Sequence, residues 1–259
     1  MMKKAIFITV RTGSSRLPQK ALMKIAGKPT IEHLIERIKH SQKKDIVVLC
    51  TTELKEDDVL VQIAQKNEIG IYRGSVKDKL ERWRGAAHTF EVDFFVTADG
   101  DDLFCEPELI DLAFSQYEKT DADFIEGKDI ICGAFTYGIK TMALEKVCEI
   151  KDTDDTEMMW VYFTQTGLFK TETLHNIPLV FKRPEIRMTL DYEEDFRFFH
   201  TIIEQFIKVK SYYSLRDILT FLDSHPDVVK INQHLQQQFL SNQKAKTKLI
   251  LKKTFTKDA

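Results

Sequence analysis

The chain has 259 residues, of which 43% are hydrophobic, so it is long enough to bury a full core as one large domain. It carries 38 Lys and Arg against 40 Asp and Glu, and the net charge of −2 favours neither nucleic acid nor an acidic membrane surface as a partner. Its apolar runs are too short to cross a bilayer. We therefore expect no nucleic-acid partner and no membrane span.

The four cysteines and the last eighteen residues give two further expectations. Cys50, Cys105, Cys132 and Cys148 lack CxxC spacing and lie in apolar surroundings, which is typical of reduced thiols in a cytoplasmic protein. Residues 242–259 hold six lysines and one aspartate, a net charge of +5. We predict a single domain over 1–241 and a frayed lysine-rich tail over 242–259, in which residues 249–251 can still dock.

Strands and helices alternate through the first hundred residues. Short apolar runs predict buried strands, and apolar stripes with the period of a helix predict amphipathic helices. The expected strands are 5–10, 45–51, 69–72 and 93–97, and the expected helices are 30–39, 57–66 and 77–88. This alternation predicts an α/β fold of three layers, with a mostly parallel, doubly wound sheet and right-handed crossovers.

The order of elements is looser after residue 107. We expect strands at 123–126, 134–139 and 185–190, and a helix-containing insertion at 151–165. Residues 127–182 are predicted to form a small middle lobe. Helices are predicted at 108–117, 142–150, 193–206, 215–222 and from Pro226 to about Asn242.

A basic loop follows the first strand. Its sequence from Val10 to Lys20 is VRTGSSRLPQK, and Pro18 excludes a continuous helix. A loop at the carboxyl end of a strand lies where open α/β sheets bind ligands. Gly13 permits a close backbone approach, serine hydroxyls add donors, and Arg and Lys can converge on a polyanion. The candidate phosphate-binding residues are Arg11, Gly13, Ser14, Ser15, Arg16 and Lys20; the alternative is a solvated basic loop.

Acidic residues follow two later strands. Asp99, Asp101 and Asp102 come directly after the strand at 93–97, and Asp191 ends the one at 185–190. Carboxylates beside a phosphate loop can hold Mg²⁺ together with phosphate oxygens. The alternative for Asp99, Asp101 and Asp102 is a cluster that caps a helix. A role in stabilising the helix dipole also fits residues 193–195, which lie in the first turn of a predicted helix.

The loop carries a resemblance to a known family. RTGSSRLPQK, followed by Gly27-Lys28-Pro29 and IEHLIERI, resembles the opening signature of the cytidylyltransferases that make CMP-activated sugar acids. It is most similar to the spore-coat-polysaccharide branch, which is related to CMP-Kdo and CMP-acylneuraminate synthetases. Gln19 stands where that family usually has glycine, a change that affects loop flexibility more than charge. The resemblance covers about residues 3–110 and 185–225.

The resemblance implies a GT-A-like nucleotidyltransferase fold, CTP as substrate and Mg²⁺ as cofactor. It places the family's two metal aspartates on Asp101 and Asp191, with Asp99 nearby; Leu103 replaces a usual proline. The turn with Thr51 aligns with a segment near the base. The stretch YRGSVKDKL aligns with a nucleotide-binding segment and adds Arg73, Gly74, Ser75 and Asp78, although Asp78 is also a favoured helix cap.

The middle of the chain departs from the relatives. Phe135 and Tyr137 stand where they carry an acid pair, and the segment EMMWVY lacks their histidine, so the acceptor can differ. Apolar residues there, which are Met158, Met159, Trp160 and Phe163, favour a core or a dimer interface over substrate contact. Lys182, Arg183 and Arg187 are candidates for holding an acceptor anion, with solvated surface as the alternative.

Together these features predict a Mg²⁺-dependent cytidylyltransferase. It would transfer CMP from CTP to a small anionic sugar acid with release of pyrophosphate, for a surface polysaccharide or glycoconjugate. The catalytic candidates are Arg11, Arg16, Lys20, Asp101 and Asp191. The resemblance also implies a homodimer. Two alternatives remain: a nucleotidyltransferase for a sugar phosphate or another phosphorylated or phosphonate acceptor, and a non-catalytic nucleotide-sugar-binding protein.

Overall fold

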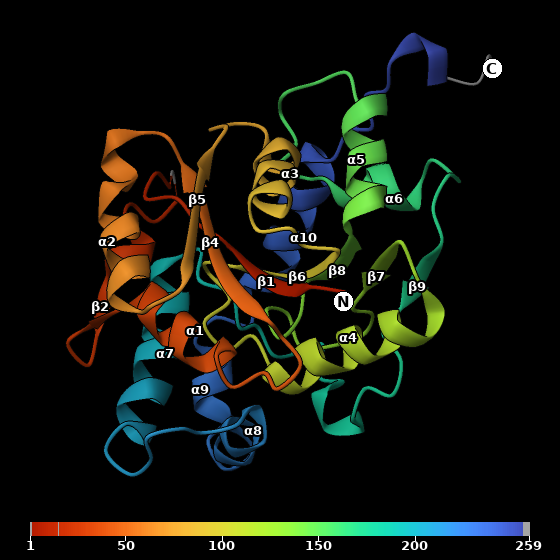
Figure 1. Ribbon diagram of the computed structural model, residues 1–259. Helices are drawn as coiled ribbons and strands as arrows, with labels where there is room; N and C mark the ends of the chain where they lie inside the picture. Colours follow the sequence, from red (N-terminus) through yellow and green to blue (C-terminus); the bar gives the residue numbers. More distant parts are fainter. Residues whose placement is uncertain (1, 15, 256–259) are drawn as a thin grey trace.

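A seven-stranded sheet forms the centre of the protein in a computed structural model, which describes residues 2–14 and 16–255 (Figure 1). The strand order is β5-β4-β1-β6-β8-β7-β9. The strands are β1 (Lys4–Thr9), β4 (Ile46–Thr52), β5 (Gly70–Gly74), β6 (Phe94–Asp99), β7 (Phe124–Glu126), β8 (Tyr137–Lys140) and β9 (Thr171–Thr173). This arrangement confirms the predicted α/β class and mostly parallel sheet.

The direction of winding reverses beside β1. Strands β5, β4, β1 and β6 are parallel, and β1 pairs with β4 on one side and β6 on the other. The chain therefore moves outward from β1 to β4 and β5, and then returns to the opposite side of β1 for β6. Because ligands bind outside the carboxyl ends of the strands at such a reversal, the fold directs attention to the ends of β1 and β6.

Helices cover both faces of the sheet, because successive side chains of each strand point to opposite faces. The buried cluster that contains Ile6 and Ile8 includes residues of α1, α2, α4, α7 and α8, while the cluster with Ala5 and Phe7 on the other face includes residues of α3, α5 and α6. Figure 1 shows α3 and α5 above the sheet and α1 and α4 below it. The helices are α1 (Thr30–Ile38), α2 (Asp58–Lys66), α3 (Lys79–Thr89), α4 (Pro107–Thr120), α5 (Thr141–Ile150), α6 (Trp160–Thr164), α7 (Glu193–Phe206), α8 (Leu215–Ser224), α9 (Pro226–Lys230) and α10 (Leu235–Lys246).

The middle region extends the main sheet. Strand β8 runs antiparallel to both β6 and β7, and β7 pairs in parallel with β9 at the edge. The predicted strand at 134–139 is thus shorter and begins at Tyr137, and the edge strand β9 was not predicted. Within 151–165, only α6 is a helix longer than one turn.

A small hairpin was also missed by the sequence analysis. Strands β2 (Lys24–Ile25) and β3 (Lys28–Pro29) pair antiparallel directly after the basic loop. Ala26 and Gly27 connect them with φ values of 50° and 79°, and positive φ at both central positions is the requirement of a tight type I′ turn. The hairpin leads into α1, so the Gly27-Lys28-Pro29 motif is a turn and a helix start.

Two predictions about the later chain were wrong. Residues 185–190 form no regular strand; Arg187 makes one isolated bridge to Cys132, and the amide of Leu190 donates to the carbonyl of Asp101 at 2.8 Å. The predicted helix from Pro226 to Asn242 is two helices, α9 and α10, separated by a turn. Helix α10 continues to Lys246, across the boundary predicted between domain and tail. Among the described residues, no helix is long and apolar enough to cross a membrane.

Candidate active site

A cavity of about 500 Å³ opens at the carboxyl edge of β1 and β6. The basic loop after β1 forms one side, and residues 99–102 after β6 form the floor. The amide of Gly100 donates to the carbonyl of Thr9 at 2.9 Å, and a Cβ at Gly100 would lie 2.7 Å from the Cβ of Val10. Glycine is required here because the two strand ends approach closely, and this approach brings the acids next to the loop.

Lys20 lies between the two predicted metal aspartates. Its Nζ is 2.6 Å from Oδ2 of Asp101 and 2.9 Å from Oδ1 of Asp191. Arg16 Nη2 donates to the same Oδ1 of Asp191 at 2.5 Å. Four residues from three distant segments therefore form one charged cluster, in which two cations of the loop face two carboxylates of the sheet edge.

The charges of this cluster reinforce one another. Burial alone would raise the pKa of Asp191, but the cations of Lys20 and Arg16 outweigh burial and lower it. Burial likewise opposes the charge on Lys20, yet Asp101 and Asp191 raise its pKa above the usual value. The other two aspartates are different: burial raises the pKa of Asp101 despite Lys20, and burial together with the carboxylates of Asp101 and Asp99 raises the pKa of Asp102 well above normal. The cluster thus keeps Asp191 ionised and Lys20 protonated near neutral pH.

Arg187 supports Asp191 from the other side. The Arg187 side chain is fully buried; its Nη2 lies 3.3 Å from Oδ2 of Asp191, and its Nε donates to Asp195 at 2.9 Å. Asp195 also accepts the backbone amides of Asp191 and Tyr192, at 2.9 and 3.0 Å. Asp195 therefore fixes the turn that carries Asp191, and Arg187 is a structural cation within the protein.

Asp57, which was not predicted, fixes the start of the basic loop. It is fully buried and accepts both the amide and the hydroxyl of Thr12, at 2.8 and 2.7 Å, as well as the hydroxyl of Thr52. Burial tends to raise the pKa of Asp57, but the hydrogen bonds from Thr52 and Thr12 lower it. Asp57 is the first residue of the helix predicted at 57–66, and nothing in the neighbouring sequence indicated its contact with the basic loop.

The structure brings most of the predicted loop and acidic residues to one cavity. Arg11 is more exposed than Arg16 and Lys20 and donates to the carbonyl of Val76 at 3.1 Å. Asp99 pairs with Lys79 at 2.9 Å. Ser15 lies outside the described residues. The predicted residues that line the cavity are Arg11, Gly13, Ser14, Arg16, Lys20, Asp99, Asp101 and Asp191.

Five predicted nucleotide residues do not line the cavity, and Arg73 and Asp78 among them are bonded within the protein instead. Arg73 donates to the carbonyls of Thr52 and Leu54 and pairs with Asp58. Asp78 caps α3 through the amide of Glu81 at 3.1 Å and is covered by Lys151. The alternative role of Asp78 as a helix cap is therefore the one observed. The five residues are Thr51, Arg73, Gly74, Ser75 and Asp78.

Three cations of the same region line the cavity although they were not predicted. They are Lys77 and Lys79, which lie within the predicted stretch, and Arg82, which follows it; Val76 lines the cavity beside them. Arg82 is 4% exposed, donates from Nη1 to the carbonyl of Ser75 at 2.5 Å, and its Nε lacks a hydrogen-bond partner. Burial lowers the pKa of Arg82. A buried donor without a partner beside a cavity is suited to a ligand acceptor. In the sequence, the spacing of Lys79 and Arg82 within a predicted helix was the signal that could have indicated that they lie on the same side of it.

The aromatic middle segment divides between core and cavity. Phe163 is buried against α3, α5 and β7, whereas Met158 and Trp160 line the cavity together with Tyr137. Met159 and Phe135 do both, since each is buried in the core and also contributes to the cavity lining, and Phe135 is only 6% exposed. Of the candidate anion-binding residues, Arg183 pairs with Glu185 and Asp223 away from the cavity, and Lys182 does not line it.

The carboxylates at this edge can bind a divalent cation whose remaining ligands are phosphate oxygens and water. The described residues hold no group of three or more His, Cys, Asp or Glu side chains that could bind a metal alone. Mg²⁺ needs only one or two carboxylates when phosphate oxygens and water complete its shell, and Asp101 and Asp191 offer those two. Lys20 now satisfies both, which shows that the pair accepts a cation.

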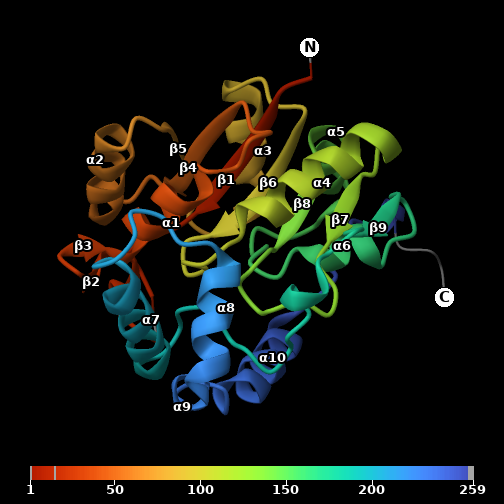
Figure 2. The same ribbon diagram turned by 90° about the horizontal axis from the view of Figure 1, so that it is seen from below.

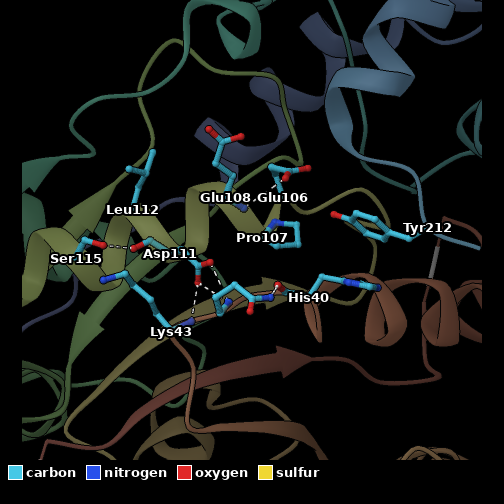
Figure 3. Close-up of a pocket in the computed structure, with 10 residues that line it drawn as sticks. His40, Lys43, Glu106, Pro107, Glu108, Asp111, Leu112, Ser115 and Tyr212 are labelled. Atoms are coloured by element: carbon cyan, nitrogen blue, oxygen red, sulfur yellow. Dashed lines mark hydrogen bonds between the residues drawn. The ribbon is translucent and has the colours of Figure 1, made fainter.

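A second hollow, of about 510 Å³, lies away from this site between the end of α1 and the start of α4 (Figure 3). Its carboxylates are already bonded: Asp111 accepts the backbone amides of Gln42 and Lys43, and Glu106 pairs with buried Arg37 at 3.0 Å. His40 stacks on Tyr212 at its rim. This hollow contains none of the predicted site residues, and its polar groups hold the protein together.

The fold and site define a nucleotidyltransferase architecture, and comparison with known proteins gives the family. Residues 5–245 match the cytidylyltransferase family, and this chain belongs to it. The predicted resemblance is therefore confirmed, and the chain is an enzyme of the cytidylyltransferase class.

Individual relatives agree with this assignment. An uncharacterized protein of Methanocaldococcus jannaschii is 33% identical over 92% of this chain and 97% of its own length. The spore coat polysaccharide biosynthesis protein SpsF of Bacillus subtilis is 23% identical over 85% of this chain and 94% of its own. A 3-deoxy-manno-octulosonate cytidylyltransferase of Anaeromyxobacter is 30% identical, over 44% of this chain and 47% of its own. The structure of a cytidylyltransferase from Leptospira borgpetersenii superposes with a TM-score of 0.80 at 26% identity, covering 88% of this chain and 97% of that one.

Proposed function

We propose that this protein transfers CMP from CTP to an anionic sugar acid in a Mg²⁺-dependent reaction that releases pyrophosphate. The observation that carries the proposal is the cluster in which Lys20 bridges Asp101 and Asp191 beside Arg16. It combines cations for a triphosphate with two hard carboxylates at the point where an α/β sheet binds ligands. The names of the relatives, which include a 3-deoxy-manno-octulosonate cytidylyltransferase, support a sugar acid as acceptor.

The reaction makes and breaks one bond at the α-phosphorus. An acceptor hydroxyl oxygen forms the new bond to phosphorus, its proton passes to water, and the bond to the pyrophosphate oxygen breaks. Arg16 and Lys20 would bind phosphate oxygens and stabilise the charge that develops on them. Asp101 and Asp191 would hold Mg²⁺, which supplies charge neutralisation at the phosphates. Arg187 and Asp195 would keep Asp191 in position.

The relation to SpsF supports a role in surface polysaccharide or glycoconjugate synthesis. The proposal includes a cytoplasmic location, where CTP is available. It also includes a homodimer, supported by the open edge of β9 and by the exposed Leu168 and Leu179 near it. Light scattering at two protein concentrations tests the dimer, and a monomer at both concentrations contradicts it.

A screen of pyrophosphate release tests the activity. The four nucleoside triphosphates are each combined with Kdo, N-acetylneuraminate and N-acetylglucosamine 1-phosphate, with and without Mg²⁺. We expect release only with CTP, Mg²⁺ and a sugar acid. Release with the sugar phosphate but with neither sugar acid would show that the acceptor is a phosphorylated sugar. No release with any pair would contradict the proposed function.

A further inference from the structure

Helix α10 forms a wall of the active-site cavity, although the sequence analysis assigned its last turn, from residue 242, to a frayed tail. Its cavity-lining positions recur at intervals of three and four, which places them along one face of the helix. Figure 2 shows α10 beside α9. The lining residues of this face are Gln236, Phe239, Leu240, Gln243 and Lys246, with Asn242 beside them.

The first turn of α10 is fixed to the group that supports Asp191. Just before the helix, Asn232 Nδ2 donates to Asp195 at 2.9 Å and to the carbonyl of Arg187 at 3.1 Å. The guanidinium of Arg187 lies 4.5 Å from the ring centre of Phe239, and its Nη1 donates to Gln236 at 3.3 Å. One arginine therefore contacts both a predicted metal ligand and the cavity face of α10.

The chain after α10 is fixed to the segment that follows α5. The amide of Asp152 donates to the carbonyl of Ile250 at 2.9 Å, and the amide of Lys252 donates to the carbonyl of Ile150 at 2.9 Å. Leu249 and Leu251 pack against the core around α5 and α6. Because both ends of α10 are fixed, its cavity-lining face is held toward the site.

The chemistry of this face differs from that of the phosphate loop. The loop side of the cavity, with Arg11, Lys77 and Arg82, supplies several cations and suits the nucleotide. Helix α10 supplies amide side chains, which both donate to and accept from hydroxyl groups, and a single cation in Lys246. Its Phe239, together with Trp160 and Tyr137 of the cavity, adds aromatic faces that suit the C–H surface of a sugar ring.

We infer that α10 is the acceptor-recognition wall, with Gln243 binding acceptor hydroxyls and Lys246 pairing with the acceptor anion. This inference rests on the proposed function, because it assigns the second substrate of the same site. The acceptor class that it names is a polyhydroxylated ring with one anionic group. A carboxylate and a phosphate share that charge, so both kinds of acceptor are compared in the test.

Matched variants on one helix provide the test. Gln243→Ala and Lys246→Ala change the cavity face, whereas Gln237→Ala and Lys244→Ala remove the same side chains from exposed positions outside the cavity lining. Pyrophosphate release is measured with Kdo, N-acetylneuraminate and N-acetylglucosamine 1-phosphate. We expect the KM of the acceptor to rise roughly tenfold in each cavity variant, as for the loss of a hydrogen bond to a charged or hydroxylated group. The KM of CTP should change less than about twofold, and the control variants should match the wild type.

Three results would overturn the inference. Cavity variants that match their controls would remove α10 from acceptor binding while leaving the cytidylyltransferase function intact. A rise confined to the KM of CTP would assign α10 to the nucleotide. If the wild type releases no pyrophosphate with any acceptor, the proposed function fails first. Saturation-transfer NMR with the same acceptors and CTP then compares wild type with Lys246→Ala, and equal binding or no binding would overturn the inference too.

Discussion

Lys20 and Asp191 lie 171 residues apart in the chain and meet with 2.9 Å between Nζ and Oδ1. The sheet topology causes this meeting, because the loop after β1 and the turn before α7 reach the same edge. The contact links a predicted phosphate-binding cation to a predicted metal ligand. Lys20 can exchange the carboxylate for a phosphate oxygen, and Asp191 can exchange the ammonium group for a metal ion, without either side chain leaving the site.

Removal of the loop cations should impair catalysis more than folding. Arg16→Ala and Lys20→Ala each remove a charge-assisted contact to a phosphate, worth about 1.5–3 kcal/mol. We expect kcat/KM for CTP to fall roughly 10- to 150-fold in each. Arg11→Ala should lose less, because Arg11 is more exposed. The control is Lys24→Ala, an exposed lysine on β2. Wild-type kinetics in both Arg16→Ala and Lys20→Ala would exclude the loop from the site.

Substitution of the two aspartates should abolish most turnover. Asp101→Asn and Asp191→Asn keep the size of each side chain but remove the anion, so kcat should fall more than nucleotide affinity. The measurement is pyrophosphate release against Mg²⁺ concentration, with Asp99→Asn as a milder comparison. Near-normal rates in the first two variants, or full activity in excess chelator, would contradict the metal mechanism.

The structure adds a stability difference between these two variants. Asp191 is 1% exposed and faces Lys20, Arg16 and Arg187, whereas the Asp101 side chain is 24% exposed. Asp191→Asn leaves buried positive charge without its partner, at a cost of about 3 kcal/mol. Thermal melting should therefore fall clearly for Asp191→Asn and little for Asp101→Asn. Equal melting temperatures would show that Asp195 alone neutralises Arg187.

Asp57 should control the loop without touching the substrate. Asp57→Asn replaces a buried anion that accepts from Thr12 and Thr52, so we expect a loss of about 1–3 kcal/mol in the free energy of unfolding. CTP affinity, measured by calorimetry, should also decrease because the loop start shifts. Asp58→Asn, at the exposed neighbouring position, is the control. CTP affinity equal to that of the wild type would limit Asp57 to stability.

The start of α8 should give a pH-dependent contribution to stability. The hydrogen bond from Lys210, followed by those from Ser214, lowers the pKa of Asp217 to about 2. The folded-state pKa is thus below the unfolded value, so the ionised carboxylate stabilises the protein above about pH 4, and this contribution disappears as pH falls toward 2. Urea unfolding of wild type and Asp217→Asn should differ most near pH 6 and converge in acid. A difference that is constant with pH would assign the effect to helix capping by a neutral group.

Phe135 and Trp160 should respond differently to substitution. Phe135 belongs mainly to the core, so Phe135→Asp should destabilise the protein by about 3–5 kcal/mol or prevent folding. Trp160 lines the cavity at the start of α6, so Trp160→Ala should raise the KM of the acceptor while CTP binding is retained. Circular dichroism melting and acceptor kinetics separate the two effects. A folded Phe135→Asp protein with a changed acceptor preference would restore Phe135 as a specificity residue.

The residues proposed to bind the nucleotide could be placed together from the sequence because they follow buried parallel strands. Apolar runs locate β1 and β6, and parallel topology then requires Lys20 and Asp101 to lie at one edge. The next stretch, around Arg73 and Asp78, follows β5 in the same way. There, the sequence did not reveal that Arg73 is hydrogen-bonded to backbone carbonyls and that Asp78 is paired with Lys151.

The later chain was harder to predict because its contacts are tertiary. The apolar and polar alternation of residues 185–190 indicated a strand, but its backbone meets only single partners, such as Asp101 and Cys132. Helix α10 is mostly polar, and its sequence pattern is that of a solvated helix. Its position depends on Arg187 and on residues 150–152, contacts that no local pattern encodes.

Leu235 is the only residue of α10 that is buried, so the rest of this helix contributes little to the core. Substitutions along its cavity face should therefore carry a small penalty in stability, in contrast to changes in β1 or β6, where almost every side chain packs. Residues on the cavity face of α10 can therefore be substituted while the sheet and the loop after β1 are preserved. For protein engineering, this makes residues 236–246 a suitable target for a combinatorial library, because most of its members should fold.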